Sequence, residues 1–284
     1  MRSPGTAADF RFNILIMGKV ARFLSFPAVL FFILVSAAPT PTAAYPRSMA
    51  ALGDSMTQAT NACCAEGNHP AQSWSTGDGK DDGVKSHYER LLRLQPGISG
   101  RNHNDSQSGA KVADLPAQAA LAASQKAAYI TILVGANDLC TPSVETMTSE
   151  AHFAANLKQA LAILDQMRPR PQVFVSSIPD IHQLWAVLHT NATAQSVWSA
   201  AEMCQSMLAR SNTEEARQQV VRREVAFNAI LSNTCAAYAG TCRSDGGAVY
   251  EYQFTTDDVS TIDYFHPSLQ GQARLAEITW EAAW

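Results

Sequence analysis

Short apolar runs that alternate with helical segments constrain the fold of this 284-residue chain most strongly. Three such runs are continuous and apolar, namely residues 49–52, 129–134 and 173–178. Runs of this kind suit the strands of a parallel sheet that is covered on both faces. Between them, residues 115–126 are rich in alanine, and residues 153–164 carry apolar side chains at helical spacing until Pro169 ends the pattern. The alternation predicts one α/β domain with three layers, α/β/α, around a mainly parallel central sheet.

The segment from residue 180 to residue 234 is expected to be mainly helical and to act as a cap-like addition. Four of its side chains fall on one helical face, namely Val197, Ala201, Cys204 and Leu208. Ser211 and Glu214 have the spacing of a capping box that opens a further helix. The segment either forms a cap beside the sheet or covers one face of the sheet. Because no repeat or linker divides the chain, residues 45–284 are expected to form a single domain.

The first 44 residues have the pattern of a signal peptide. Four basic residues precede an apolar run at residues 23–35, and small residues and prolines follow it. The run is about 13 residues long and contains Pro27, whereas a helix that spans a membrane needs about 20 residues. Small residues before Tyr45 suit cleavage there. We therefore expect a secreted protein without a stable membrane span, and an uncleaved anchor is the alternative.

Composition and charge exclude two classes of partner. With 46% apolar residues the chain can bury a substantial core. Removal of residues 1–44 takes away four basic residues and one acidic residue, which leaves 17 basic and 24 acidic residues and a net charge of −7. Because this charge is negative, the mature protein is not expected to bind nucleic acid or anionic membranes.

All six cysteines lie in the expected mature part, namely Cys63, Cys64, Cys140, Cys204, Cys235 and Cys242. Their even number suits disulfide bonds formed in an oxidising compartment. Cys235 and Cys242 close a short loop and are the first expected pair. The adjacent residues Cys63 and Cys64 are not expected to bond to each other. One of these two is expected to pair with Cys140 or Cys204 instead.

Metal-binding motifs are absent from the sequence. The chain contains no C-x-x-C and no H-E-x-x-H motif. Zinc is therefore not expected, and the chemistry considered below implies no cofactor.

Four short stretches carry reactive or polar residues at strand ends or in loops. They are "GDSMT" with Ser55, "SGAKV" with Gly109, "GAND" with Asn137, and "DYFHP" with Asp263 and His266. Ligands of open α/β sheets bind outside the carboxyl ends of the strands. Ser55 and Asn137 directly follow expected strands, so both reach that edge. Each stretch alone has ordinary turn or cap composition, and it is their joint occurrence that indicates a site.

Together these residues supply the groups that acyl transfer from a serine requires. Ser55 is the candidate nucleophile, His266 the base that takes its proton, and Asp263 the acid that orients the imidazole. The backbone N–H groups of Ser55 and Gly109 and the side-chain amide of Asn137 are the candidate donors to the developing oxyanion. The three-residue step from Asp263 to His266 lets the carboxylate reach one imidazole nitrogen while the other faces the serine.

In this order, the four stretches resemble the sequence blocks of the SGNH hydrolases, also called GDSL esterases and lipases. The resemblance runs from residue 53 to residue 267 and implies a flavodoxin-like sheet. It also implies the nucleophile, oxyanion donors, base and acid just named. The longer phrases "SQSGAKVADLP" and "GANDLC" are similar to the phospholipase B branch, and "DYFHPSLQGQARLA" is similar to secreted bacterial members.

Two departures bear on this resemblance. The chain has no G-x-S-x-G elbow, which disfavours an ordinary α/β-hydrolase, and Met56 stands where a leucine or isoleucine is more usual. Methionine has a similar volume, so the chemistry is not affected.

The sequence therefore predicts a secreted, monomeric serine ester hydrolase that acts on lipid or other carboxylic esters through an acyl-enzyme. A polysaccharide O-deacetylase and a non-catalytic protein that binds glycan or lipid are the alternatives, because a fold does not determine a function. Five large apolar side chains of the helical segment belong either to the core or to a surface for an acyl chain, namely Trp185, Leu188, Trp198, Met203 and Met207.

Overall fold

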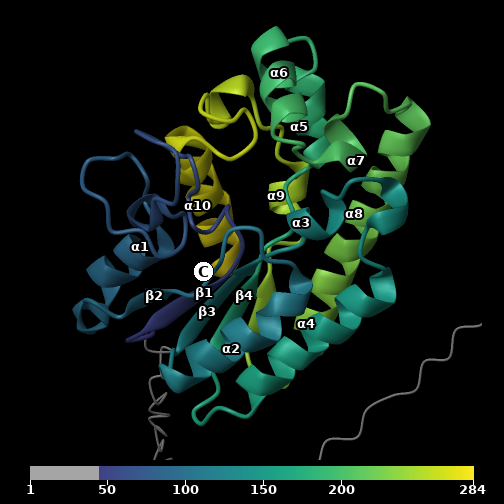
Figure 1. Cartoon of the computed structure of the whole chain (residues 1–284). Coiled ribbons are helices and arrows are strands. Elements are labelled where there is room, and N and C mark those ends of the chain that lie inside the picture. Colours follow the sequence, from purple (N-terminus) through teal and green to yellow (C-terminus); the bar gives the residue numbers. More distant parts are fainter. Residues whose placement is uncertain (1–44) are drawn as a thin grey trace, which may run out of the picture. The chain divides into compact units, whose positions relative to one another are not determined.

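The computed structural model describes residues 45–284, so the expected signal peptide at residues 1–44 lies outside the described residues. A five-stranded sheet with the strand order β2-β1-β3-β4-β5 forms its centre, and all four neighbouring pairs are parallel (Figure 1). The strands are β1 (Met49–Gly53), β2 (Asn102–Asn104), β3 (Tyr129–Leu133), β4 (Gln172–Val175) and β5 (Cys242–Ser244). This order is flavodoxin-like, and the predicted fold class is confirmed.

The three apolar runs form the three central strands. β1 and β3 are buried along their whole length, and β4 is buried from its second residue onward. β2 and β5 were not predicted, because their sequences Asn-His-Asn and Cys-Arg-Ser contain no apolar run. Both are edge strands with one neighbour each, and a short, partly exposed edge needs no continuous apolar sequence.

Helices cover both faces of the sheet and complete three layers (Figure 1). One face packs against α2 (Leu115–Ser124), α4 (Glu150–Asp165) and α8 (Glu214–Ala236), and the other against α1 (His87–Leu94) and α10 (Leu269–Ala283). Alternate residues of the strands enter the two cores, as the pleat of a strand requires. α2 and α4 confirm the helices that were predicted from the alanine-rich segment and the helical spacing. None of the helices among residues 45–284 is long and apolar enough to cross a membrane.

The segment that was expected to be helical contains four helices. α5 (Ile181–Leu188), α6 (Ala192–Ala200) and α7 (Gln205–Leu208) precede α8. α8 packs on α4, β4 and β5, while α5 and α7 contact each other and α8. The last helix therefore covers a sheet face, and the shorter helices lie next to it. Two further short helices, α3 (Ala136–Leu139) and α9 (Ala248–Glu251), follow β3 and β5.

Two local expectations in this segment are wrong. The four residues that were expected on one helical face do not share a helix, because α6 ends at Ala200 and Cys204 adopts a left-handed conformation with φ +42° before α7 begins. The capping box at Ser211 does not form either. Thr213 caps α8 instead, and its side chain accepts a hydrogen bond of 3.2 Å from the N–H of Ala216.

The disulfide pairing differs from the expected one in two of three pairs. Cys235 pairs with Cys242 as predicted, with their Cα atoms 5.4 Å apart. Cys140, which follows α3, pairs with Cys204 across 4.1 Å between Cα atoms, and Cys63 pairs with Cys64. The prediction failed because the loop with Cys63 and Cys64 packs on the C-terminal segment, around residues 256–262, rather than beside α3. Cys64 has a left-handed backbone with φ +66°.

Candidate active site

The turn that carries Ser55 begins where β1 ends at Gly53. Gly53 has φ +148°, and a Cβ atom there would collide with the carbonyl oxygen of Leu133 on the neighbouring strand. Glycine is therefore required at this position. Gln118 of α2 holds both backbone groups of Gly53, since its Oε1 accepts from the Gly53 N–H at 2.8 Å and its Nε2 donates to the Gly53 carbonyl at 2.9 Å. This arrangement fixes the end of the strand from which Ser55 projects.

The residues after Gly53 wind into consecutive hydrogen-bonded turns. The carbonyl of Asp54 accepts from the N–H of Gln58 at 3.1 Å, and the carbonyl of Ser55 accepts from the N–H of Thr60 at 3.0 Å. The Asp54 carboxylate accepts from the N–H of Met56 at 3.0 Å. Burial outweighs this hydrogen bond and raises the pKa of Asp54 to about 7. The turns hold Ser55 at the carboxyl edge of the sheet.

His266 connects Ser55 to Asp263, although 211 residues separate His266 from Ser55 in sequence. The Nε2 atom of His266 lies 2.8 Å from the Ser55 Oγ, and its Nδ1 lies 2.6 Å from the Asp263 Oδ2. Because an ionised carboxylate can only accept, Nδ1 carries the proton and donates a hydrogen bond to Asp263. Nε2 is then free to accept a hydrogen bond from the Ser55 hydroxyl.

The carboxylate of Asp263 is held by several donors. Its Oδ1 accepts from the backbone N–H groups of Phe265 at 2.9 Å and His266 at 3.0 Å, and its Oδ2 also accepts from the Asn61 amide at 2.6 Å. Burial by itself raises the pKa of Asp263, but the hydrogen bond and charge of His266, together with Asn61, hold it below its usual value. Asp263 is therefore ionised at neutral pH.

Asn137 reaches the same edge from α3, directly after β3. Its Nδ2 donates to the carbonyl oxygen of Ala110 at 3.0 Å, which uses one of its two N–H groups and leaves the other available. Gly109 precedes Ala110 in an exposed loop and has φ +82°. The structure thus brings Asn137 into one pocket with Ser55 and His266, whereas Gly109 is linked to Asn137 through Ala110 and is not among the residues that line the pocket.

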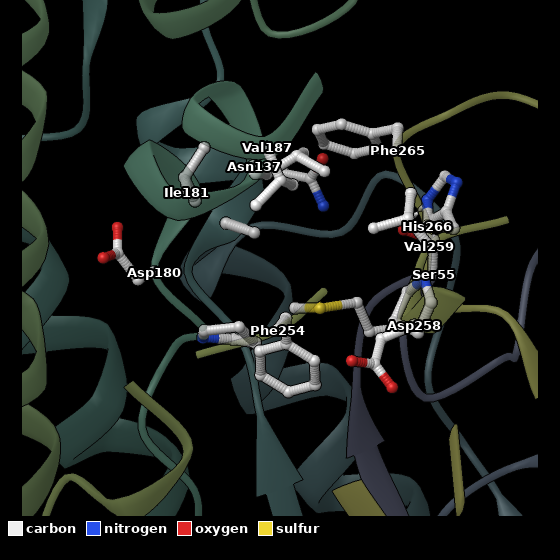
Figure 2. Close-up of a pocket in the computed structure, with 15 residues that line it drawn as sticks. Ser55, Asn137, Asp180, Ile181, Val187, Phe254, Asp258, Val259, Phe265 and His266 are labelled. Carbon is white, nitrogen blue, oxygen red and sulfur yellow. Dashed lines mark hydrogen bonds between the residues drawn. The ribbon is translucent and has the colours of Figure 1, made fainter. Parts of the chain in front are cut away.

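The pocket beside Ser55 is mostly apolar. Ten apolar residues line it, namely Met56, Ala136, Pro179, Ile181, Leu184, Val187, Phe254, Val259, Phe265 and Pro267. Figure 2 shows Ser55 and His266 on one side of the pocket and Asp180 and Ile181 on the opposite side. Its charged residues are Asp180 and Asp258, and the lining contains no lysine or arginine. The two carboxylates therefore disfavour an anionic ligand, and the apolar lining suits an apolar one.

The helical segment supplies the pocket with a face that the sequence did not single out. Ile181, Leu184 and Val187 of α5 line the pocket. Of the five residues expected in the core or in an acyl surface, three are buried in the core, and Trp185 and Met203 pack against it while partly exposed. Apolar residues occur on several sides of α5, so periodicity alone does not tell which side faces a ligand.

Two residues that the sequence analysis did not identify organise the site, namely Gln118 and Asn61. The sequence held a signal for Gln118, because this polar residue lies on the helix face that Leu115 and Ala122 bury. A polar side chain there needs a buried hydrogen-bond partner. Asn61 gave no signal, because its partner Asp263 is 202 residues away in sequence.

The arrangement has the groups that acyl transfer needs. A serine hydroxyl contacts an imidazole, the imidazole contacts an ionised carboxylate, and an asparagine side chain lines the same pocket. No cluster of three or more His, Cys, Asp or Glu side chains suited to a metal ion occurs among residues 45–284.

Comparison with known proteins places these features in a family. Residues 51–274 match the model of the GDSL-like lipase/acylhydrolase family. The membrane-associated phospholipase B1 of Rattus norvegicus is 26% identical over 271 residues, which cover 82% of this chain and 18% of that protein. The chain thus spans about a fifth of the length of this curated relative.

Solved structures share the fold at low identity. LAE5, an alpha/beta hydrolase enzyme from the metagenome of Lake Arreo, Spain, matches with a TM-score of 0.53 at 16% identity, over 83% of this chain and 94% of that one. The extracellular lipase of Streptomyces rimosus matches with a TM-score of 0.50 at 16% identity, over 83% of this chain and 99% of that one. The family match covers most of the chain and confirms the resemblance seen in the sequence: the chain belongs to the GDSL-like lipase/acylhydrolase family of ester hydrolases.

Proposed function

We propose that this protein is a serine ester hydrolase in which Ser55 attacks the carbonyl carbon of an ester while His266 takes the serine proton. The observation that carries the proposal is the hydrogen-bonded series Ser55–His266–Asp263, with distances of 2.8 and 2.6 Å, at the edge of an apolar pocket. Asp263 holds the imidazole in the required tautomer and stabilises the imidazolium that forms. His266 then protonates the departing alcohol, and water releases the acyl group from Ser55.

Three N–H groups are proposed to hold the oxyanion. Asn137 lines the pocket, and its second side-chain N–H is the first proposed donor, because the hydrogen bond to the Ala110 carbonyl already fixes the amide. The backbone N–H groups of Ser55 and Gly109 are the other two. Donors fixed in advance stabilise the tetrahedral intermediate without reorganising during the reaction.

An uncharged acyl chain is the ligand that the pocket suits best. Its lining is largely apolar, and among residues 45–284 it contains no lysine or arginine that would pair with an anionic group. The similarity to a phospholipase B1 supports a lipid ester, although only a fifth of that protein is matched. We therefore propose a lipid or another long-chain carboxylic ester, bound with its acyl chain against α5.

Hydrolysis of p-nitrophenyl acetate, butyrate, octanoate and palmitate tests this substrate class. The wild-type protein is expected to show a higher kcat/KM for octanoate than for acetate. Leu184→Trp, which fills the pocket from α5, is expected to lower kcat/KM for octanoate by about tenfold and to spare acetate. Leu121→Trp, on the exposed surface of α2, is the matched control. A preference for acetate that Leu184→Trp does not change would favour the polysaccharide O-deacetylase.

Export is the second part of the proposal. All six cysteines are paired within residues 45–284, which suits an oxidising compartment, and the pattern of residues 1–44 is that of a signal peptide. N-terminal sequencing of protein from the medium of expressing cells is expected to begin at Tyr45. Recovery of cell-bound protein that still begins at Met1 would contradict export by cleavage.

A further inference from the structure

Asn61 makes hydrogen bonds with each of its polar groups just behind Asp263. Its backbone N–H donates to the carbonyl of Gly67 at 2.8 Å, and its Oδ1 accepts from the N–H of Gly67 at 2.8 Å. Its own carbonyl accepts from the Ser260 hydroxyl at 2.5 Å, and its Nδ2 donates to the Asp263 Oδ2 at 2.6 Å. Asn61 therefore connects its own loop to the carboxylate of the proposed triad.

These contacts fix which end of the Asn61 amide faces Asp263. The reverse orientation would place the amide NH₂ against the N–H of Gly67 and the amide oxygen against the Asp263 carboxylate. The backbone of Asn61 is left-handed, with φ +55°, a conformation that asparagine adopts more readily than most residues. Both the side chain and the backbone position therefore suit this residue.

The loop that carries Asn61 is attached to the rest of the site. The N–H of Thr60 donates to the carbonyl of Ser55 at 3.0 Å, and the carbonyl of Ala62 accepts from the N–H of Leu269, at the start of α10, at 3.1 Å. The Asn61 amide is thus held in place by the residues before and after it in the chain before any substrate binds.

Asn61 and His266 donate to the same oxygen of Asp263. Because Asp263 is 6% exposed, water supplies little stabilisation to the anion, and fixed donors must replace it. We propose that Asn61 is a positioning residue that keeps Asp263 ionised and directed at His266. This inference rests on the proposed function. Asp54, in the turn after β1, is a further titratable group, and the charge of His266 acts to lower its pKa; the variants below leave it unchanged.

Two substitutions of Asn61 test the inference. Asn61→Asp keeps the size of the side chain and the acceptor for Gly67, but it places a carboxylate against Asp263. Asn61→Gly removes the side chain and still permits the left-handed backbone. Ser260→Ala is the matched control, because it removes a hydrogen bond to the same loop and leaves the Asn61 amide against Asp263.

The readout is the pH dependence of kcat/KM for p-nitrophenyl octanoate. Loss of the donor destabilises the Asp263 anion, so the coupled Asp263–His266 pair binds its proton more tightly. The acid limb of the pH profile therefore moves to higher pH. Asn61→Asp is expected to move its midpoint up by about one pH unit or more, because like charges repel. Asn61→Gly is expected to move it less and to lower kcat by about tenfold. Ser260→Ala is expected to keep the wild-type midpoint.

A fall in kcat with an unchanged midpoint in both Asn61 variants would overturn the inference, since a purely structural role of the loop predicts that result. The variant Asp263→Asn separates this failure from failure of the proposed function. If Asp263→Asn is inactive while both Asn61 variants keep the wild-type profile, the triad stands and the role of Asn61 does not. If Asp263→Asn keeps full turnover, both are wrong. Thermal melts identify any variant that fails to fold, and if only one Asn61 variant folds, its midpoint decides the question.

Discussion

Ser55→Ala is expected to remove ester hydrolysis while leaving the fold intact. The Ser55 hydroxyl contacts the Nε2 of His266 and makes no other hydrogen bond within residues 45–284. Loss of a serine nucleophile lowers kcat by about 10⁴-fold or more, and the remainder reflects binding and oxyanion stabilisation alone. The measurement is kcat for p-nitrophenyl octanoate at pH 8, together with a thermal melt of the same preparation.

The control for Ser55→Ala is a variant that is expected to lose part of its activity, but not all of it. Asn137→Ala removes a proposed oxyanion donor but keeps the nucleophile, so kcat is expected to fall by about a hundredfold, with little change in KM. Turnover by Ser55→Ala within about tenfold of the wild type would mean that another residue is the nucleophile. An effect of Asn137→Ala on KM alone would remove Asn137 from the oxyanion site.

Asp263→Asn is expected to reduce kcat by about 10⁴-fold. The asparagine keeps the oxygen that accepts from the backbone N–H groups of Phe265 and His266, so the loop remains in place. It loses the charge that holds the Nδ1 proton of His266, and the imidazole then presents a protonated Nε2 to Ser55. That nitrogen cannot accept the serine proton. The measurement is kcat between pH 6 and pH 9.

Asp257→Asn is the matched control for Asp263→Asn. Asp257 is an exposed carboxylate in the same C-terminal segment and is not among the residues that line the pocket. Full activity is expected from Asp257→Asn at every pH. If Asp257→Asn lost activity while Asp263→Asn kept it, Asp257 rather than Asp263 would be the acid.

The centre of the fold was predictable because a strand buried on both faces must be apolar along its length. β1, β3 and β4 meet that condition. β2 and β5 do not, since each has one neighbour and packs through few residues. α2 and α4 were predictable for a different reason, because each carries apolar residues on the face that packs on the sheet. The turn at Cys204 was missed because a left-handed residue other than glycine leaves no local pattern.

The sequence predicted the residues of the candidate site, but it did not predict the residues that hold them in position. Ser55, Asn137 and His266 lie in recognisable stretches, and the structure gathers them at one pocket. The bonds from Gln118 to Gly53 and from Asn61 to Asp263 join segments that are far apart in sequence. The pairing of Cys140 with Cys204 was missed for the same reason, because it depends on which loops meet in three dimensions.

Covalent capture of the nucleophile identifies the residue that attacks the ester. The purified protein is treated with diethyl p-nitrophenyl phosphate, which esterifies an activated serine, and the modified residue is located by peptide mass spectrometry. We expect one diethylphosphoryl group on Ser55, loss of ester hydrolysis in proportion to labelling, and no labelling of Ser55→Ala. Labelling at a different residue, or hydrolysis that persists when Ser55 is fully modified, would contradict the assignment of Ser55 as the nucleophile.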